Sequence, residues 1–164
     1  MSTPDIAVIM GSVSDSDIAA KATKVLDTYG VSYELGVKSA HRTPKEMLQY
    51  AEGLAERGVK VVIALAGGSA HLPGMVASST SIPVLAVPVK REHHGDEAMK
   101  SSTALPPGIP VAVMPNNGAD RAALMAVRIL ALSDSELAVK YLASQEEMRA
   151  SVVAQDEAMR KDGI

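Results

Sequence analysis

The feature that most constrains the fold is an alternation of short strand-like runs with segments of helical periodicity. Short apolar runs rich in β-branched residues are typical of strands buried in a parallel sheet. The five predicted strands cover residues 6–10, 31–37, 59–65, 82–87 and 110–114. Because right-handed crossovers place helices on both faces of such a sheet, the pattern predicts a doubly wound α/β fold.

Helices are predicted between these strands and after the last one. They cover residues 17–29, 44–58, 75–78, 119–132 and 135–160. Gly30 is suited to end the first helix, and Ser133 and Asp134 are suited to cap the last. The last helix is highly charged, too long for a small domain to cover, and apolar on more than one side. We therefore expect it to contact a neighbouring subunit; the alternative is a solvated tail beyond Glu147.

Composition bounds the class of protein. The 164 residues predict one domain, residues 1–164, and a net charge of −3 gives no basic excess that would suggest nucleic acid. The apolar runs are shorter than the roughly 20 residues that span a bilayer, and Ser2, Thr3 and Asp5 differ from a signal peptide. Zero cysteines rule out a thiol nucleophile and fit a cytoplasmic protein. Without Phe or Trp, the core must pack through small and aliphatic side chains.

The first strand-to-helix junction has the composition of an anion cradle. Gly11 allows a sharp turn, and the hydroxyls of Ser12 and Ser14 can join free N–H groups at a helix start. Asp15 would repel a phosphate, so a functional Asp15 should accept hydrogen bonds from neutral hydroxyls such as those of a ribose. The alternative is that these residues only cap the helix.

The second junction, residues 39–44 (SAHRTP), pairs a histidine with a permanent cation. His41 is the side-chain type that titrates near neutral pH, and Arg42 is suited to an anionic ligand. The pattern indicates acid/base chemistry on an anion, and the alternative is a pair of ordinary loop residues.

The third junction, residues 66–74, is rich in glycine. Gly67 and Gly68 allow a flat ligand close to the backbone, while His71 taken alone would be a packing histidine. His93 and His94 are adjacent and have no evident carboxylate or Cys partner, so no metal site is predicted there.

Three segments in this order and spacing resemble the PurE family of purine biosynthesis, class I, the N5-carboxyaminoimidazole ribonucleotide mutases. They are GSVSD at 11–15, SAHRTP at 39–44 and AGGSAHLPGM at 66–75, and residues 83–89 and 106–111 also fall in register. The resemblance implies a flavodoxin-like three-layer αβα sandwich with a five-stranded parallel sheet, assembled as a homo-octamer. It also implies carboxylate transfer from the exocyclic nitrogen to C4 of an imidazole, without a metal or nucleotide cofactor.

The resemblance also implies roles for individual residues. His41 would be the general acid/base, and Asp15 would accept the ribose hydroxyls. Contacts to the phosphate would come from Ser12, Ser14 and Arg42. The remaining implied substrate-binding residues are Ser39 and the loop that would hold the base and CO2, namely Gly67, Gly68, Ser69, Ala70 and His71.

The chain departs from the class I pattern in residues 91–105. Glu97 stands where Asp is usual, and Ala104-Leu105 where Gln-Met is usual; Asp120-Arg121 replaces a segment that usually contains Asn. Because these segments help to close the pocket over the imidazole, other readings stay open. They are a paralogue acting on another phosphorylated heterocycle, a class II carboxylase that uses aminoimidazole ribonucleotide and CO2 directly, and a non-catalytic nucleotide-binding module.

Overall fold

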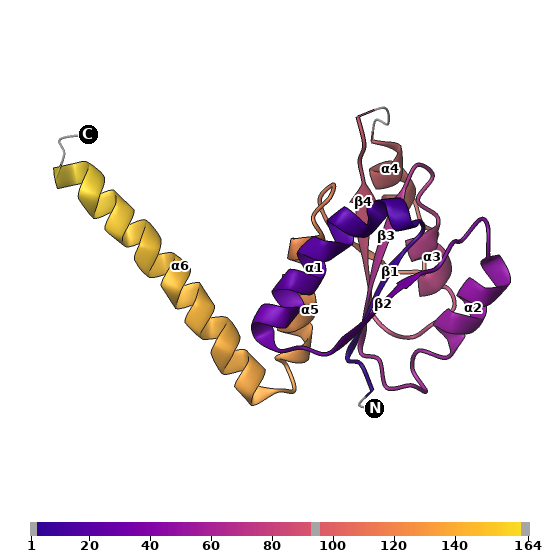
Figure 1. Cartoon of the computed structure of the whole chain (residues 1–164), viewed down its shortest axis with the longest axis horizontal. Helices are drawn as coiled ribbons and strands as arrows, with labels where there is room; N and C mark the ends of the chain where they lie inside the picture. Colours follow the sequence, from indigo (N-terminus) through magenta and orange to yellow (C-terminus); the bar gives the residue numbers. More distant parts are fainter. Residues whose placement is uncertain (1–2, 93–95, 162–164) are drawn as a thin grey trace.

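A five-stranded parallel sheet forms the centre of the protein (Figure 1). The structure, a computed structural model, describes residues 3–92 and 96–161. The strand order is β2-β1-β3-β4-β5. The strands are β1 (Ile6–Met10), β2 (Tyr33–Val37), β3 (Val61–Gly67), β4 (Val84–Val89) and β5 (Ala112–Val113). All neighbouring strands in this order are parallel.

Helices cover both faces of the sheet, as expected from right-handed crossovers. They are the one-turn 3₁₀ helix η1 (Val13–Asp15), α1 (Ser16–Tyr29), α2 (Pro44–Glu52), α3 (Leu72–Ala77), α4 (Glu97–Thr103), α5 (Ala119–Leu130) and α6 (Ser135–Lys161). Alternate residues of β1 face opposite sides: Val8 packs in the cluster that includes α1 and α5, whereas Ile9 packs in the cluster that includes α2 and α3. The predicted three-layer αβα sandwich with a long C-terminal helix is therefore confirmed.

The predicted boundaries hold best where the chain carries a strong stop signal. Gly30 ends α1 with a left-handed backbone (φ 69°), and Asp134 caps α6 by accepting the N–H of Leu137 at 3.0 Å. The helix predicted to run to Gly58 ends instead at Glu52. Gly53 follows at this point, and the N–H of Leu54 bonds to the carbonyl of Ala51, three residues back, so that the chain continues in turns.

Helix α4 was not predicted from the sequence. Its seven residues carry several polar side chains and only a weak apolar pattern, and just Ala98 and Ser102 are buried. It lies beyond the carboxyl end of β4, in the segment that departs from the family pattern, so this segment contributes ordered structure next to the three junctions (Figure 1).

Small side chains join α1, α5 and the sheet. Their shared cluster contains six fully buried alanines, which are Ala19, Ala22, Ala119, Ala122, Ala123 and Ala126. Small residues let two helices approach closely, so the absence of large aromatic side chains from the chain is matched by close packing.

Helix α6 docks only through its first turns and then projects away from the sandwich (Figure 1). Leu137 is buried, the Tyr29 and Tyr141 rings lie 6.3 Å apart, and the Tyr29 hydroxyl lies 2.6 Å from that of Ser144. From Gln145 onward every described residue of the helix is exposed. Within residues 3–92 and 96–161, no helix is both long enough and apolar enough to cross a membrane.

Packing between α1 and α5 gives the first prediction. Replacing Ala22 with leucine adds volume to a site with no space and should lower the free energy of unfolding by about 1–3 kcal/mol. The measurement is urea unfolding followed by circular dichroism. Ala20→Leu, on the exposed side of the same helix, is the matched control and should change the midpoint little. Equal midpoints for the two variants would contradict the proposed tight packing.

Candidate active site

The loops after β1, β2 and β3 meet at the carboxyl edge of the sheet, where they enclose a cleft of about 530 Å³. In open α/β sheets this edge is where ligands bind. The predicted site residues that line the cleft are Ser12, Ser14, Asp15, Ser39, His41, Arg42, Gly67, Gly68, Ala70 and His71. Ser69 does not line it; its carbonyl accepts a hydrogen bond from the Ser101 hydroxyl of α4.

The first loop forms a compact turn held to its neighbours. The N–H of Gly11 bonds to the carbonyl of Leu65 on β3 at 3.1 Å, and the Ser12 hydroxyl accepts the N–H of Ser14 at 3.3 Å. Arg42 reaches over from the next loop and donates from Nη2 to the Gly11 carbonyl at 2.9 Å. Its Nε donates to the Ser39 hydroxyl at 3.2 Å. Serine hydroxyls and the Arg42 guanidinium thus line the same cleft, which suits an anion.

Asp15 lies at the inner side of this loop and is only 7 % exposed. Burial raises the pKa of its carboxyl group, while the Ser14 hydroxyl, which donates at 3.3 Å, and the nearby Arg91 act in the opposite direction. An acceptor that is buried but retains charged and polar neighbours is suited to binding neutral hydroxyl groups.

His41 and His71 form a hydrogen-bonded pair at the mouth of the cleft. Nε2 of His41 lies 2.7 Å from Nδ1 of His71, and the rings are nearly perpendicular at 88°. His41 comes from the loop after β2, and His71 immediately precedes α3. In such a pair one nitrogen donates and the other accepts, so a proton taken up by one ring can be passed to the other.

The glycine-rich loop holds His71 in place with an unusual backbone. Gly68 has φ +59° and Ala70 has φ +42°, a left-handed conformation that costs a non-glycine residue about 1–2 kcal/mol. The N–H of Ala70 bonds to the carbonyl of Gly67 at 3.1 Å, which closes the turn. Such strain is most often found at functional sites.

Comparison with known proteins agrees with this arrangement. A profile of the AIR carboxylase family matches residues 5–151. The chain belongs to this family. N5-carboxyaminoimidazole ribonucleotide mutase of Saccharolobus solfataricus is 47 % identical over 152 residues, covering 92 % of this chain and 96 % of that protein. The protein of the same name from Aquifex aeolicus is 49 % identical over 138 residues, covering 84 % and 83 %.

A solved structure is also similar to this AIR carboxylase family member. The crystal structure of Treponema denticola PurE superposes with a TM-score of 0.83 at 30 % sequence identity. The match covers 94 % of this chain and 97 % of that one, so the similarity in fold extends over the whole sandwich.

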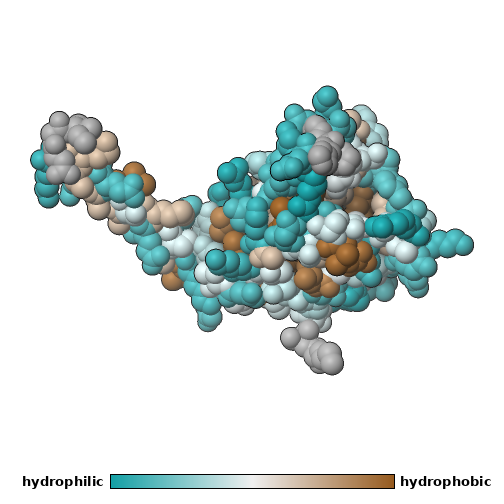
Figure 2. Space-filling model, turned by 45° about the horizontal axis from the view of Figure 1, so that its top comes forward, coloured by the Kyte–Doolittle hydropathy of each residue, from teal (hydrophilic) through white to brown (hydrophobic). Residues whose placement is uncertain are grey.

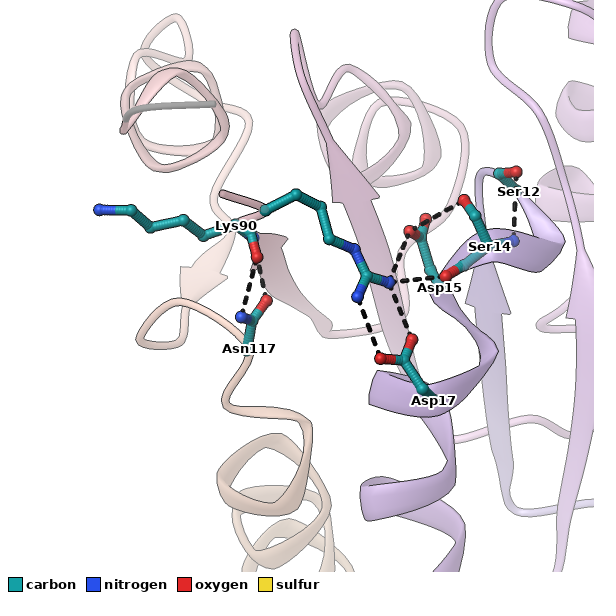
Figure 3. A network of polar contacts seen from close by, with 7 residues as sticks. Ser12, Ser14, Asp15, Asp17, Lys90 and Asn117 are labelled. Atoms are coloured by element: carbon teal, nitrogen blue, oxygen red, sulfur yellow. Dashed lines mark hydrogen bonds and ion pairs between the residues drawn. The ribbon is translucent and has the colours of Figure 1, made fainter. Parts of the chain in front are cut away.

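Arg91 is the charged residue of the cleft lining that the sequence-based predictions missed. It follows β4, and its guanidinium donates to both Asp17 oxygens at 2.8 and 3.0 Å and to the Ser14 carbonyl at 2.6 Å (Figure 3). This guanidinium lowers the pKa of Asp17 to about 2. Its position in the sequence could have identified it, because Arg91 follows the carboxyl end of a buried strand, as the three recognised junctions do.

No metal centre is evident in the part of the chain that the structure describes, where no three His, Asp or Glu side chains are grouped as metal ligands would be. His93 and His94 lie outside the described residues.

The opposite pKa shifts of Asp15 and Asp17 give a second prediction. Because the folded pKa of Asp15 is raised, its ionised form costs stability above that pKa, so Asp15→Asn should raise the melting temperature at pH 7. The gain should vanish as the pH falls below about 4, where Asp15 is protonated in both states. Asp17→Asn should instead lower the melting temperature at pH 7. The pKa of Asp17 is lower in the folded protein than in the unfolded chain, so its carboxylate stabilises the fold at any pH above the ordinary pKa of an aspartate. That stability is lost as the pH falls towards 2.

Melting curves of both variants and the wild type between pH 3 and 8 would measure these differences. A lower melting temperature for Asp15→Asn than for the wild type at pH 7 would contradict the assignment of burial as the dominant influence on Asp15. The Asp17 change should be the smaller of the two because its pair is exposed.

Proposed function

We propose that this AIR carboxylase family member is an N5-carboxyaminoimidazole ribonucleotide mutase, which moves a carboxylate from N5 to C4 of the imidazole in purine biosynthesis. The observation that carries the proposal is the His41–His71 pair, joined at 2.7 Å, in the same cleft as the Arg42 anion cradle. A phosphorylated substrate with a proton to move needs both features together. The relatives that bear the mutase name match nearly the whole chain.

The phosphate is assigned to Ser12, Ser14 and Arg42. Arg42 is already oriented by Ser39 and Gly11, so little conformational entropy is lost when its remaining N–H groups bind phosphate oxygens. Asp15 then accepts the ribose hydroxyls. This placement leaves the imidazole ring for the loop after β3, in which Gly67, Gly68, Ala70 and His71 line the cleft and the glycines permit close approach of a flat ring.

The proposed reaction moves one proton in the direction opposite to the carboxylate. When the N5–carboxylate bond breaks, N5 gains a proton and CO2 is released into the cleft. C4 then attacks CO2, and the C4 proton must leave to restore the aromatic ring. Protonated His41 donates its proton to N5 and then accepts the proton that leaves C4, so that it ends as it began. His71 can share the extra proton before the first transfer and after the second, because the two rings are hydrogen-bonded. The reaction balances without an oxidant, reductant, metal or nucleotide cofactor.

CO2 must stay beside C4 between these steps, which requires a wall that holds few water molecules. Apolar residues supply part of the lining, namely Ala40, Ala66, Ala70, Leu72 and Val89. All five are buried, so they are fixed by the core rather than by solvent.

A second candidate is carboxylation or decarboxylation of a related phosphorylated heterocycle. The observation that favours it is the position of Arg91, which lines the cleft although it belongs to the segment that departs from the class I pattern. Incubation with N5-carboxyaminoimidazole ribonucleotide distinguishes the two, since only the mutase transfers its carboxylate to C4.

The exposed part of α6 supports assembly into a homo-oligomer, for which we propose an octamer of single-domain protomers. Its exposed apolar residues are Val139, Leu142, Met148, Val152, Val153 and Met159. At about 100° per residue they fall into two separate stripes whose centres are about 130° apart, the first containing Leu142 and the second Val152. Figure 2 shows apolar side chains along the projecting helix between hydrophilic ones. Two separate exposed apolar stripes each need a partner surface, which other protomers can provide.

The same proposal assigns the protein to the cytoplasm, with small-molecule substrates and with neither a nucleic acid nor a membrane as partner. It is supported by zero cysteines and a net charge of −3.

The test of the proposed function compares the two histidines. His41→Asn should retain the fold and nucleotide binding but lower turnover by about 10²- to 10⁴-fold, as expected for loss of a general acid/base. The assay follows carboxylate transfer and the exchange of the C4 proton of aminoimidazole ribonucleotide with solvent deuterium. His71→Asn should keep a measurable exchange rate, because water can replace the second ring of the pair.

An active His41→Asn beside an inactive His71→Asn would reverse the two roles. A wild-type protein that neither transfers the carboxylate nor exchanges the C4 proton would count against the mutase and favour the second candidate.

The oligomer is tested by adding a charge to each stripe of α6. Leu142→Glu and Val152→Glu should each give smaller species than the wild type in light scattering at micromolar concentration, since each buries a carboxylate in a contact. The matched control is Ala154→Glu, which adds the same charge to an exposed position between the stripes and should leave the assembly unchanged. A monomeric wild type would refute the assembly altogether.

A further inference from the structure

Arg91 connects two parts of the cleft that the sheet order keeps apart. It follows β4, whereas the residues it contacts follow β1, and β3 lies between these strands. Its Nη2 lies 2.6 Å from the Ser14 carbonyl oxygen, 2.8 Å from Asp17 Oδ1 and 3.6 Å from Asp15 Oδ1. Arg91 therefore spans the carboxyl end of β3 and forms one side of the cleft.

We propose that Arg91 is a positioning residue for Asp15, fixing the carboxylate that accepts the ribose hydroxyls of the substrate. The inference rests on the proposed function, because it requires a ribonucleotide in the cleft. It adds a contact from the segment after β4 to a subsite built by the loop after β1.

The contacts of Asp15 explain why it needs such a residue. Within the described part of the chain, its two polar side-chain contacts are the long hydrogen bond from Ser14 at 3.3 Å and Arg91 at 3.6 Å, and both are made to Oδ1. Oδ2 is then left to accept from a ligand. A buried carboxylate with one long hydrogen bond is weakly fixed in orientation, and the adjacent cation restricts it further while keeping its charged form favourable.

The position of Arg91 is itself determined by several contacts. A planar guanidinium can bind the Asp17 carboxylate with two nitrogens while one of them also reaches the Ser14 carbonyl, which the single ammonium of lysine would not reproduce. Asp17 lies in the first turn of α1, so Arg91 is bound to the same helix start that carries Asp15. The distance between the Asp15 carboxylate and the Arg91 guanidinium is therefore fixed by this helix start.

The test compares binding of aminoimidazole ribonucleotide with binding of its 2′,3′-dideoxyribose analogue by titration calorimetry. The wild type should prefer the ribonucleotide, and Arg91→Gln should lower this preference about 10-fold by weakening the ribonucleotide alone. The analogue should bind both proteins equally. In Asp15→Asn protein, adding Arg91→Gln should cause no further loss, because both changes act on one contact.

Lys90→Gln is the matched control for the loss of a positive charge. Lys90 precedes Arg91, pairs with Asp96 at 2.9 Å and extends away from Asp15 (Figure 3), so its removal should leave the preference at the wild-type value. An unchanged preference in Arg91→Gln, or an equal weakening of both ligands, would overturn the role assigned to Arg91 while leaving the mutase intact. A wild type that neither binds aminoimidazole ribonucleotide nor transfers carboxylate would overturn the proposed function, and the inference with it.

Discussion

The parallel pairing of β1 with β2 and β3 determines where every polar residue of the cleft lies. Met10 at the end of β1 stands opposite Val37 on one side and Leu65 on the other. Because all three strands run in the same direction, the loops that follow them leave the sheet at the same edge. A shift of one residue in this register would exchange the side chains that β1 presents to the two helical layers, so the packing of both core clusters also aligns the cleft.

The loop after β1 is held from two sides by arginines on other loops. Arg42 donates to the Gly11 carbonyl and Arg91 to the Ser14 carbonyl, so the two ends of this short loop are each fixed by a charged donor. Charge-assisted hydrogen bonds are stronger than neutral ones, and backbone carbonyls cannot move without the chain. Arg42 thereby organises the phosphate cradle before a ligand binds, whereas Arg91 fixes the end of the loop that carries Asp15, and each reduces the entropy that binding must offset.

The sequence was sufficient for the architecture and for most of the cleft because both depend on local patterns. Buried strands read as short apolar runs, and Gly11, His41 and Gly67 lie at or within a few residues of the ends of such runs. Helix α4 was missed because its polar side chains give little periodicity, and the end of α2 was placed late because Leu54 continues the apolar spacing after Gly53. The partnership of Arg91 with Asp17 depends on a contact over 74 positions in the chain, which no local pattern contains.

The cleft contains groups whose placement costs free energy. Asp15 is buried at a cost in free energy, and Ala70 adopts a left-handed backbone, yet both lie beside a core whose apolar residues are almost completely buried. The strands that end at the cleft supply a large part of that burial, since β1, β3 and β4 are buried along nearly their whole length. Stability from the centre of the sheet thus offsets strain at its edge, and a ligand that hydrogen-bonds to Asp15 would recover part of that cost on binding.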